Sequence, residues 1–246
     1  MIQPILDVSR WQGNIDADVM LASDVRGLII RLGSIDYNGP YEDFLFRENH
    51  AKFDHALPCG YYWYFRPEYS GVRQGEYIVA RLNELQIKPR LPIVTDVEEN
   101  VKLLSKAEFW YELLSCINVL INNGYENVAD YTRGIFWNDN LGNPVGASEH
   151  KLGIARYSAI LTHPWGDHDR YRPLPWNDYW WWQKSADGNG LGPTYGCDSN
   201  DVDYGVVNMT ESEWKIYTEE DVPAVSWKCL LGDFLVQLGE SLGKDC

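Results

Sequence analysis

Short apolar runs recur along the chain, separated by segments of mixed or polar character. Eight of these runs are candidate strands, at residues 5–9, 27–33, 59–65, 91–98, 127–132, 151–157, 179–185 and 201–205. Strands of a parallel sheet are apolar almost throughout, because other elements cover both faces of the sheet. The pattern therefore predicts a parallel sheet that is enclosed on both sides.

Helical spacing of the apolar positions follows the early strands, over residues 43–56, 71–86 and 105–123. The third segment has the clearest limits, because Ser105 and Glu108 match a capping box and Gly124 stands where a helix commonly ends. After the fifth strand the connections are rich in Gly, Pro, Asn and Asp, which favours loops. We therefore predict an α/β fold, a TIM-like (β/α) barrel of eight strands with a reduced set of outer helices in its second half.

Composition narrows the possible partners. The 246 residues suit one barrel domain, and a formal net charge of -15 argues against nucleic acid and against an anionic membrane surface. No apolar run approaches the roughly 18 residues of a membrane-spanning helix, so we expect no membrane insertion. The 11 Trp and 16 Tyr suit either a large core or a cleft in which sugar rings stack on aromatic side chains.

Charged residues stand at or near the ends of the apolar runs. Asp7 and Arg31 each follow a run, Asp96 and Glu98 end the fourth, and Asp203 falls in the last. In a parallel barrel the active site lies at the carboxyl ends of the strands, where residues distant in sequence meet around one mouth. The sequence therefore predicts an acidic site at that mouth.

The spacing of Asp96 and Glu98 supports a functional pair. Residues two apart on a strand face the same way, with Cα atoms about 6.6 Å apart at a rise of roughly 3.3 Å per residue. Glu99 points the other way and is expected to be a solvated loop acid. Alone, two such carboxylates would more often be surface residues, but the acids at other strand ends favour a shared site.

Eight motifs occur in order between about residues 3 and 208: "LDVSRWQGNID", "IIRLG", "GYYWYFRP", "PIVTDVEEN", "DYTRGIFW", "LGIARYS", "WWQKSADGNG" and "DVDYG". Together they resemble the motifs of glycoside hydrolase family 25 lysozymes, the muramidase type common among phage endolysins. The resemblance implies a barrel with fewer than eight outer helices. It also implies hydrolysis of the β-1,4 bond between N-acetylmuramic acid and N-acetylglucosamine in peptidoglycan, with retention of configuration.

The resemblance assigns roles to the four acids. Glu98 matches the general acid, Asp96 its companion carboxylate, Asp7 the acid of the first strand and Asp203 the acid of the last. We expect the other three acids to raise the pKa of Glu98 by like-charge repulsion, so that it is protonated when it acts. The family is thought to use the substrate's own N-acetyl group, oriented by Asp96, but the sequence leaves open a direct attack by an aspartate.

The resemblance also implies that five side chains contact the substrate: Tyr62, Tyr64, Tyr131, Trp182 and Gln183. Arg31 is a further candidate, which could bind a carboxylate of the substrate. Core packing is the alternative for the tyrosines. An ion pair with Asp7 is the alternative for Arg31.

Two departures from the family pattern concern the walls of the cleft. Gly205 stands where the family usually has Asn, which leaves the choice between Asp201 and Asp203 open, with Asp203 favoured. Gly153 stands where the family often has Trp, which is expected to reshape one wall. Neither departure changes the acids.

Three functions of other classes stay open. Carboxylates at a barrel mouth could hold Mg²⁺ or Ca²⁺ in a metal-dependent hydrolase. The barrel could instead bind wall glycans without cutting them, or the protein could be a structural component of a phage particle with residual lytic ability. The five cysteines are scattered, odd in number and without a Cys-x-x-Cys pair, so we expect reduced thiols, no metal and no cofactor.

The two ends of the chain carry separate expectations. The start, "MIQPILD", lacks the basic and apolar regions of a signal peptide, which suits a phage enzyme released on lysis or exported by another route. We expect the catalytic barrel over residues 1–208 and an extension over 209–246. Apolar residues at helical spacing in the extension predict one amphipathic helix docked on the barrel, or else a self-association helix: Trp227, Leu230, Leu231, Phe234, Leu238 and Leu242.

Overall fold

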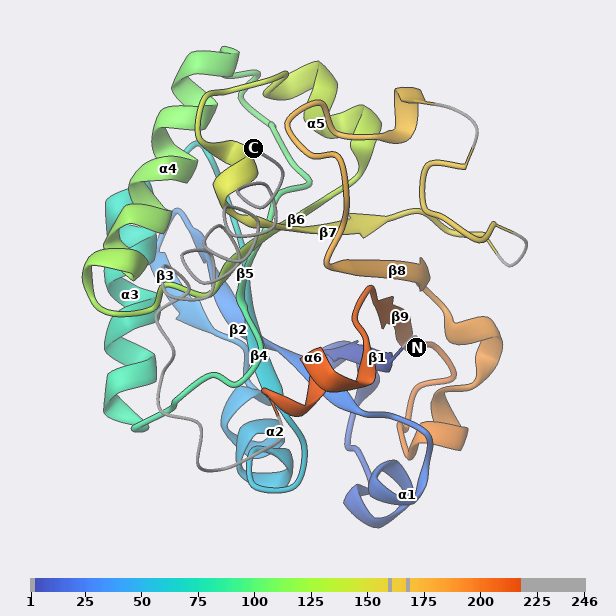
Figure 1. Cartoon of the computed structure of the whole chain (residues 1–246). Coiled ribbons are helices and arrows are strands. Elements are labelled where there is room, and N and C mark those ends of the chain that lie inside the picture. Colours follow the sequence, from blue (N-terminus) through green and yellow to red (C-terminus); the bar gives the residue numbers. More distant parts are fainter. Residues whose placement is uncertain (1–2, 159–160, 167–168, 218–246) are drawn as a thin grey trace, which may run out of the picture.

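Eight strands close into a barrel in the computed structural model, which describes residues 3–158, 161–166 and 169–217 (Figure 1). The strands of the barrel are β1 (Gln3–Val8), β2 (Gly27–Asp36), β4 (Cys59–Tyr64), β5 (Ile93–Asp96), β6 (Val128–Thr132), β7 (Lys151–Ala155), β8 (Trp181–Ser185) and β9 (Asp203–Val207). The predicted strands and the barrel are thereby confirmed. A further strand, β3 (Gly39–Glu42), which the sequence did not suggest, pairs with β2 outside the ring.

Strand direction differs from the prediction in one place. Neighbouring strands run parallel from β1 through β2, β4, β5, β6 and β7 to β8, whereas β9 is antiparallel to both β8 and β1. The prediction that all eight are parallel was wrong. Between β8 and β9 the described chain forms only short 3-10 turns, Gly188–Gly190 and Gly192–Tyr195, and no helix returns it to the opposite end of the barrel. The start of β9 therefore lies at the same mouth as the ends of the other strands.

Helices cover the first half of the barrel more fully than the second. The described helices are α1 (Ala17–Ala22), α2 (Phe46–Phe53), α3 (Gly71–Glu84), α4 (Lys106–Asn122), α5 (Gly134–Asn140) and α6 (Glu211–Lys215). The three predicted helices correspond to α2, α3 and α4, and the capping box of Ser105 and Glu108 is present. Gly71 lets α3 approach α4 closely, since a Cβ there would overlap the carbonyl of Glu112.

Two apolar clusters lie on the two sides of the barrel wall. Ile5 and Ile29 belong to the inner cluster, while their neighbours Leu6 and Leu28 belong to the larger outer cluster under the helices. This division follows from the period-two alternation of strand side chains. Cys59 and Cys116 are free thiols buried in the outer cluster, as expected for core residues.

The amino ends of the parallel strands form the closed end of the barrel, and α6 lies against it. Thr210 caps this short helix with Glu213, and Trp214 is fully buried against the inner cluster. The sequence did not predict this helix. The amphipathic segment predicted beyond it, together with Cys229 and Cys246, lies outside the described residues.

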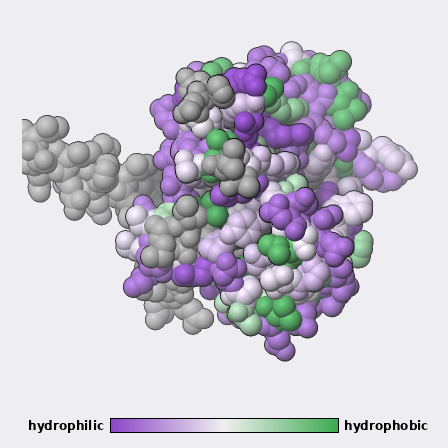
Figure 2. Space-filling model, turned by 90° about the vertical axis from the view of Figure 1, so that its right-hand side faces the viewer, coloured by the Kyte–Doolittle hydropathy of each residue, from purple (hydrophilic) through white to green (hydrophobic). Residues whose placement is uncertain are grey.

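The surface is largely hydrophilic on the face shown in Figure 2, where exposed apolar residues form small separate spots. No helix in the described part of the chain is long and apolar enough to cross a bilayer.

Candidate active site

The predicted acids meet at the mouth formed by the carboxyl ends of the parallel strands. Asp7 on β1 lies directly opposite Asp203 on β9, and Asp96 is the last residue of β5, next to Tyr64 on β4 and Tyr131 on β6. The cavity between them has a volume of about 200 Å³. Its lining is Asp7, Trp11, Arg31, Tyr62, Tyr64, Val94, Asp96, Glu98, Tyr131, Tyr157, Trp181, Gln183 and Asp203.

Asp7 and Asp203 form a pair of directly opposed carboxyl groups. Burial, and then repulsion by Asp203, raise the pKa of Asp7 well above its usual range. Burial raises the pKa of Asp203 to about 7, although its hydrogen bond with Asp7 lowers it. Directly opposed carboxylates on neighbouring strands repel when both are ionised, so the pair retains one proton at a pH where isolated aspartates have lost theirs. Asp201 is exposed just outside the strand, so the structure brings Asp203 to the cleft.

Asp96 is a buried acid without a full set of hydrogen bonds. Only 7% of the residue is exposed, and its Oδ1 accepts no hydrogen bond from the described residues. Burial raises its pKa well above the usual range, Glu98 raises it further, and Arg31 lowers it. Asp96 therefore lines the cleft with a carboxyl group that is mostly buried and not fully hydrogen-bonded.

Glu98 follows β5 by two residues and is more accessible than Asp96. Its Oε1 lies 3.3 Å from Nε of Arg133, and 23% of its side chain is exposed. Burial is the largest cause of its raised pKa; Arg133 lowers the pKa and Glu99 raises it. Desolvation, rather than repulsion by the three cleft aspartates as expected, is thus the main cause of the raised pKa of Glu98.

Gln183 connects two sides of the cleft. Its Nε2 donates a hydrogen bond to Oδ2 of Asp7 at 2.8 Å, and the hydroxyl of Tyr131 donates to its Oε1 at 2.5 Å. All three side chains are buried. This chain of hydrogen bonds fixes the orientation of the amide, so Asp7 has one oxygen committed to Gln183 and the other available to Asp203.

Arg31 faces the tyrosines of β4. Its guanidinium carbon lies 5.8 Å from the ring centre of Tyr62 and 5.5 Å from that of Tyr64. The charged group closest to it is Asp43, whose Oδ2 is 4.0 Å from Nε of Arg31. The ion pair with Asp7 that the sequence left open is not formed, and Nε has no hydrogen-bond partner among the described residues.

Trp182 is not part of the cleft, and that expectation is corrected. It lies in the outer core, where its Nε1 donates to the carbonyl of Arg156 at 2.8 Å. Gln183 points inward, so strand alternation directs Trp182 outward and Trp181 inward. Trp181 lines the cleft in its place.

The two glycines that depart from the family pattern both contact Trp181. A Cβ on Gly153 would lie 3.0 Å from the Trp181 ring, and one on Gly205 would overlap its Nε1. These positions are on β7 and β9, which flank β8. The ring of Trp181 therefore occupies the space that larger residues at either position would need.

Sequence reasoning missed four residues of the site. Trp11 and Tyr157 line the cleft and are 66% and 54% exposed, Trp181 forms part of its wall, and Arg133 contacts Glu98. Strand alternation from Gln183 could have identified Trp181. Trp11 lies within the first motif, but nothing in the sequence indicates that a short 3-10 turn, Arg10–Gln12, brings it to the mouth.

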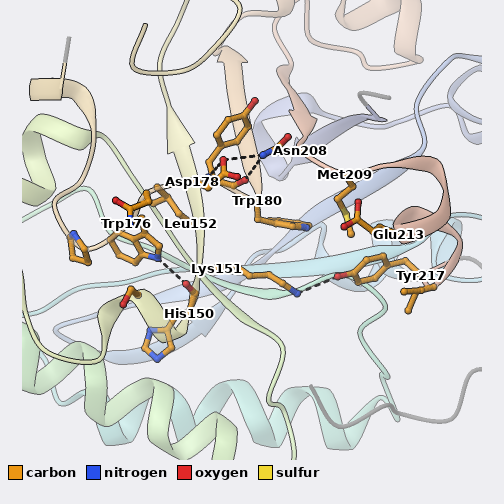
Figure 3. Close-up of a pocket in the computed structure, with 15 residues that line it drawn as sticks. His150, Lys151, Leu152, Trp176, Asp178, Trp180, Asn208, Met209, Glu213 and Tyr217 are labelled. Atoms are coloured by element: carbon orange, nitrogen blue, oxygen red, sulfur yellow. Dashed lines mark hydrogen bonds between the residues drawn. The ribbon is translucent and has the colours of Figure 1, made fainter. Parts of the chain in front are cut away.

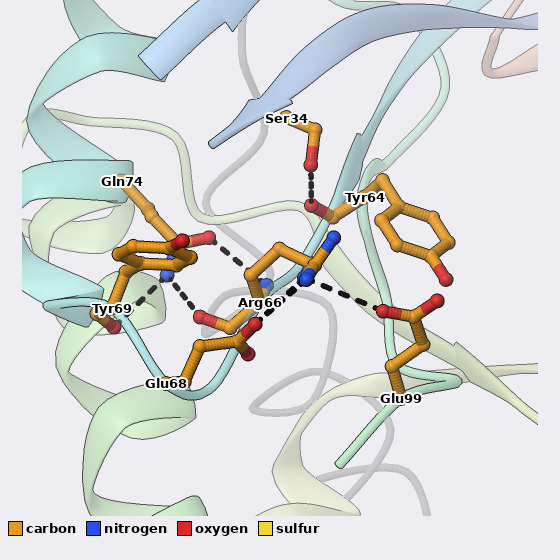
Figure 4. Close-up of polar contacts among 7 residues, drawn as sticks. All are labelled: Ser34, Tyr64, Arg66, Glu68, Tyr69, Gln74 and Glu99. Carbon is orange, nitrogen blue, oxygen red and sulfur yellow. Dashed lines mark hydrogen bonds and ion pairs between the residues drawn. The ribbon is translucent and has the colours of Figure 1, made fainter. Parts of the chain in front are cut away.

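Glu99 is not among the residues that line the cleft, but it is not simply solvated, because it lies beside the cleft residue Tyr64. It pairs with Arg66 at 3.4 Å, and Arg66 also pairs with Glu68 at 2.7 Å (Figure 4). Gln74 accepts a hydrogen bond from the backbone nitrogen of Arg66. This network ties the segment after β5 to the segment after β4 and so holds Glu98 at the mouth.

A larger cavity, of about 690 Å³, lies at the closed end beside α6 (Figure 3). It contains Lys151, whose Nζ donates to the hydroxyl of Tyr217 at 3.2 Å, and it is remote from the four acids because it adjoins the amino ends of β7 and β8. Among the described residues, no group of three or more His, Cys, Asp or Glu is arranged to hold a metal ion.

The sequence matches glycosyl hydrolases family 25 over residues 6–192, a span that holds Asp7, Asp96 and Glu98 but ends before Asp203. The bacterial lysozyme from Streptomyces coelicolor superposes with a TM-score of 0.70 at 22% identity, covering 86% of this chain and 94% of that one. A family 25 glycosyl hydrolase from Bacillus anthracis gives 0.67 at 19%, covering 88% and 93%. A muramidase from Trichobolus zukalii gives 0.68 at 21%, covering 87% and 97%. No curated protein matches the chain.

Proposed function

The chain belongs to glycosyl hydrolases family 25, and from this premise we propose that it is a lysozyme that hydrolyses peptidoglycan. It cuts the β-1,4 bond between N-acetylmuramic acid and N-acetylglucosamine in the bacterial cell wall. The observation that carries the proposal is an acidic cleft in which Asp96, at the end of β5, and Glu98, two residues beyond it, have pKa values raised by burial. The lysozyme and muramidase named among the similar structures support the same substrate.

Glu98 is the general acid. Glycosidic cleavage needs a proton on the leaving oxygen and a group that stabilises the positive charge developing at the anomeric carbon. Burial keeps Glu98 protonated to a higher pH than a free glutamic acid. Its partly exposed carboxyl can reach a sugar chain lying across the mouth, donate the proton as the bond breaks, and later accept one from water.

Asp96 orients the N-acetyl group of the substrate. Its carboxylate lines the cleft and can accept the amide N–H, which turns the acetyl oxygen toward the anomeric carbon. Ionised Asp96 then stabilises the positive charge on the cyclic intermediate, and Arg31 favours that ionised form. Water opens the intermediate from the face that the leaving group vacated, so configuration is retained. Direct attack by an aspartate is the competing route.

The remaining cleft residues bind and orient the sugar. Tyr62, Tyr64 and Arg31 form one wall, and Tyr131 with Gln183 forms another. Exposed aromatic faces at the mouth, those of Trp11 and Tyr157, suit stacking on pyranose rings. Asp7 and Asp203 share one proton and add negative charge beneath the developing cation.

The test is the release of reducing ends from purified peptidoglycan, with mass spectrometry of the fragments. New reducing ends on N-acetylmuramic acid support the proposal, and ends on N-acetylglucosamine contradict it. Loss of activity in a chelator would instead favour a metal-dependent hydrolase. Glycan binding without any cleavage would indicate a wall-binding component. A trapped covalent adduct on an aspartate would replace the substrate-assisted route.

A further inference from the structure

Arg133 contacts the proposed acid from the solvent side. It follows β6 directly, its Nε lies 3.3 Å from Oε1 of Glu98, and 57% of its side chain is exposed. It is the one cation within ion-pair distance of Glu98 among the described residues. The other groups that interact electrostatically with Glu98 are acids or tyrosines on, or just after, strands β4 to β7 and β9: Tyr64, Asp96, Glu99, Tyr131, Tyr157 and Asp203.

This contact opposes the reaction while it lasts. A guanidinium beside a carboxylate favours the ionised form, whereas a general acid must carry its proton. The pair is also weak, because exposed ion pairs contribute about 0–1 kcal/mol. Arg133 can therefore exchange Glu98 for another carboxylate that approaches from solvent, and a guanidinium binds such a group through two parallel hydrogen bonds.

The substrate class supplies that carboxylate. Peptidoglycan carries short peptides with free carboxyl groups on its N-acetylmuramic acid residues, and the cleft itself is too acidic to attract them. Resting on the proposed function, we propose that Arg133 binds a carboxylate of the substrate's peptide and in doing so leaves Glu98. Peptide recognition and protonation of the acid are then coupled, since burial and Glu99 raise the pKa of Glu98 and Arg133 no longer opposes them.

The experiment compares wild type, Arg133→Gln and Arg133→Lys on two substrates, intact glycan–peptide fragments and the same glycans after enzymatic removal of the peptides. On the intact fragments, Arg133→Gln should raise KM about fivefold, the equivalent of roughly 1 kcal/mol. Arg133→Lys should raise KM by less, because lysine keeps the positive charge. On peptide-free glycans the KM should not change. Arg73→Gln, at an exposed site on α3, is the control and should change neither.

The pH profile separates this role from a structural one. In wild type acting on intact fragments, the alkaline limb of kcat should lie at higher pH than that of kcat/KM. The two limbs should coincide on peptide-free glycans and in Arg133→Gln. If wild type does not turn over peptide-free glycan, the dissociation constants of both fragments, measured by calorimetry, are compared in place of KM.

The role proposed for Arg133 would be overturned if Arg133→Gln changed KM equally on both substrates. It would also be overturned if the two alkaline limbs coincided in wild type on intact fragments. Neither result would affect the proposed function. The proposed function fails separately, if wild type releases no reducing ends from peptidoglycan.

Discussion

The two cavities, one at each end of the barrel, differ in size and in charge. The cavity at the closed end is about 690 Å³ and contains the buried ammonium of Lys151, whereas the cleft at the mouth is about 200 Å³ and contains four acids. Burial disfavours the charged form of the titratable groups in both cavities. It raises the pKa of the acids and lowers the pKa of Lys151 to about 7. A choice of the active site by cavity volume alone would have selected the closed end. The opposed and desolvated acids indicate the mouth instead.

A pair of consecutive tryptophans lies between the two cavities. Trp180 lines the closed-end cavity, Trp181 lines the cleft, and their ring centres are 6.5 Å apart. The difference between the two cavities can therefore be tested by substitutions in either cavity and next to the two tryptophans that separate them.

The largest effect is expected from the acids at and just beyond the end of β5, Asp96 and Glu98. Glu98→Gln keeps the shape of the side chain but cannot deliver a proton, so we expect a loss of about 10² to 10⁴ in rate, near the upper value because the leaving alkoxide is poor. Asp96→Asn should cost a comparable amount. Reducing-end release is the measurement, with circular dichroism as the folding check and Asp178→Asn, in the closed-end cavity, as the control expected to remain active.

Retention of more than about a tenth of the wild-type rate by Glu98→Gln would remove Glu98 from the role of acid. If Asp7→Asn is more damaging than either, the strand-one carboxylate is the nucleophile or base.

The space around Trp181, between the two cavities, should not accept a larger residue in place of Gly205. Gly205→Asn restores the residue usual in the family, but its Cβ would overlap Trp181 and approach the carbonyl of Trp182. Overpacking of this kind costs about 1–3 kcal/mol, measurable by denaturant unfolding. Gly190→Asn is the control, because nothing lies within 4 Å of a Cβ there and Asn tolerates its φ of 76°. Equal stability of the two variants would show that Trp181 moves freely.

Replacement of Asp203 in the Asp7–Asp203 pair should stabilise the protein and lower its activity. Since burial raises the pKa of Asp203 from 3.8 to about 7, its ionisation destabilises the folded state increasingly as pH rises through this range. Asp203→Asn should therefore be more stable than wild type at pH 8 by at least about 1 kcal/mol, given roughly 1.4 kcal/mol per pKa unit. The gain should disappear below about pH 4, where both states are protonated. Its activity should fall less than that of Glu98→Gln.

Thermal unfolding of Asp203→Asn and wild type across that pH range makes the comparison. A stability difference that is independent of pH would mean that the aspartate carries no excess charge in the cleft.

Lys151 should show the opposite dependence. Its pKa falls from 10.5 to about 7 on burial, so the unfolded state binds more protons between these values and wild-type stability rises with pH. The advantage of Lys151→Met over wild type should be largest at pH 7 or below. It should then shrink by about 1.4 kcal/mol per pH unit toward pH 10. Lys102→Met, at an exposed site, should give no such trend.

The smallest effect concerns the segment beyond the described residues. The described part of the chain ends at Tyr217, and the docking of the amphipathic segment on the barrel stays a prediction. Deletion of residues 220–246 should lower the melting temperature by about 2–4 °C for each kcal/mol lost. A lower mass with unchanged melting would favour self-association instead, and no change in either would refute docking.

Much of the fold could be predicted from local patterns. Apolar runs located the eight strands, and helical spacing with a capping box located α3 and α4, because periodicity and caps depend on residues close in sequence. The motifs identified the acids Asp7, Asp96, Glu98 and Asp203, which the structure brings to one cleft. Alternation from Gln183 would also have chosen Trp181 over Trp182, had it been applied.

Only the tertiary structure decided how these parts interact. The direction of β9 depends on a connection without a helix, and the place of α6 depends on the apolar surface that the closed end leaves uncovered. The pKa of Glu98 depends first on burial, and the partner of Arg31 proved to be Asp43 rather than Asp7. Sequence specifies which groups are present and which face of a strand they share. Desolvation and charge pairing depend on distances between segments far apart in the chain, and only folding sets those distances.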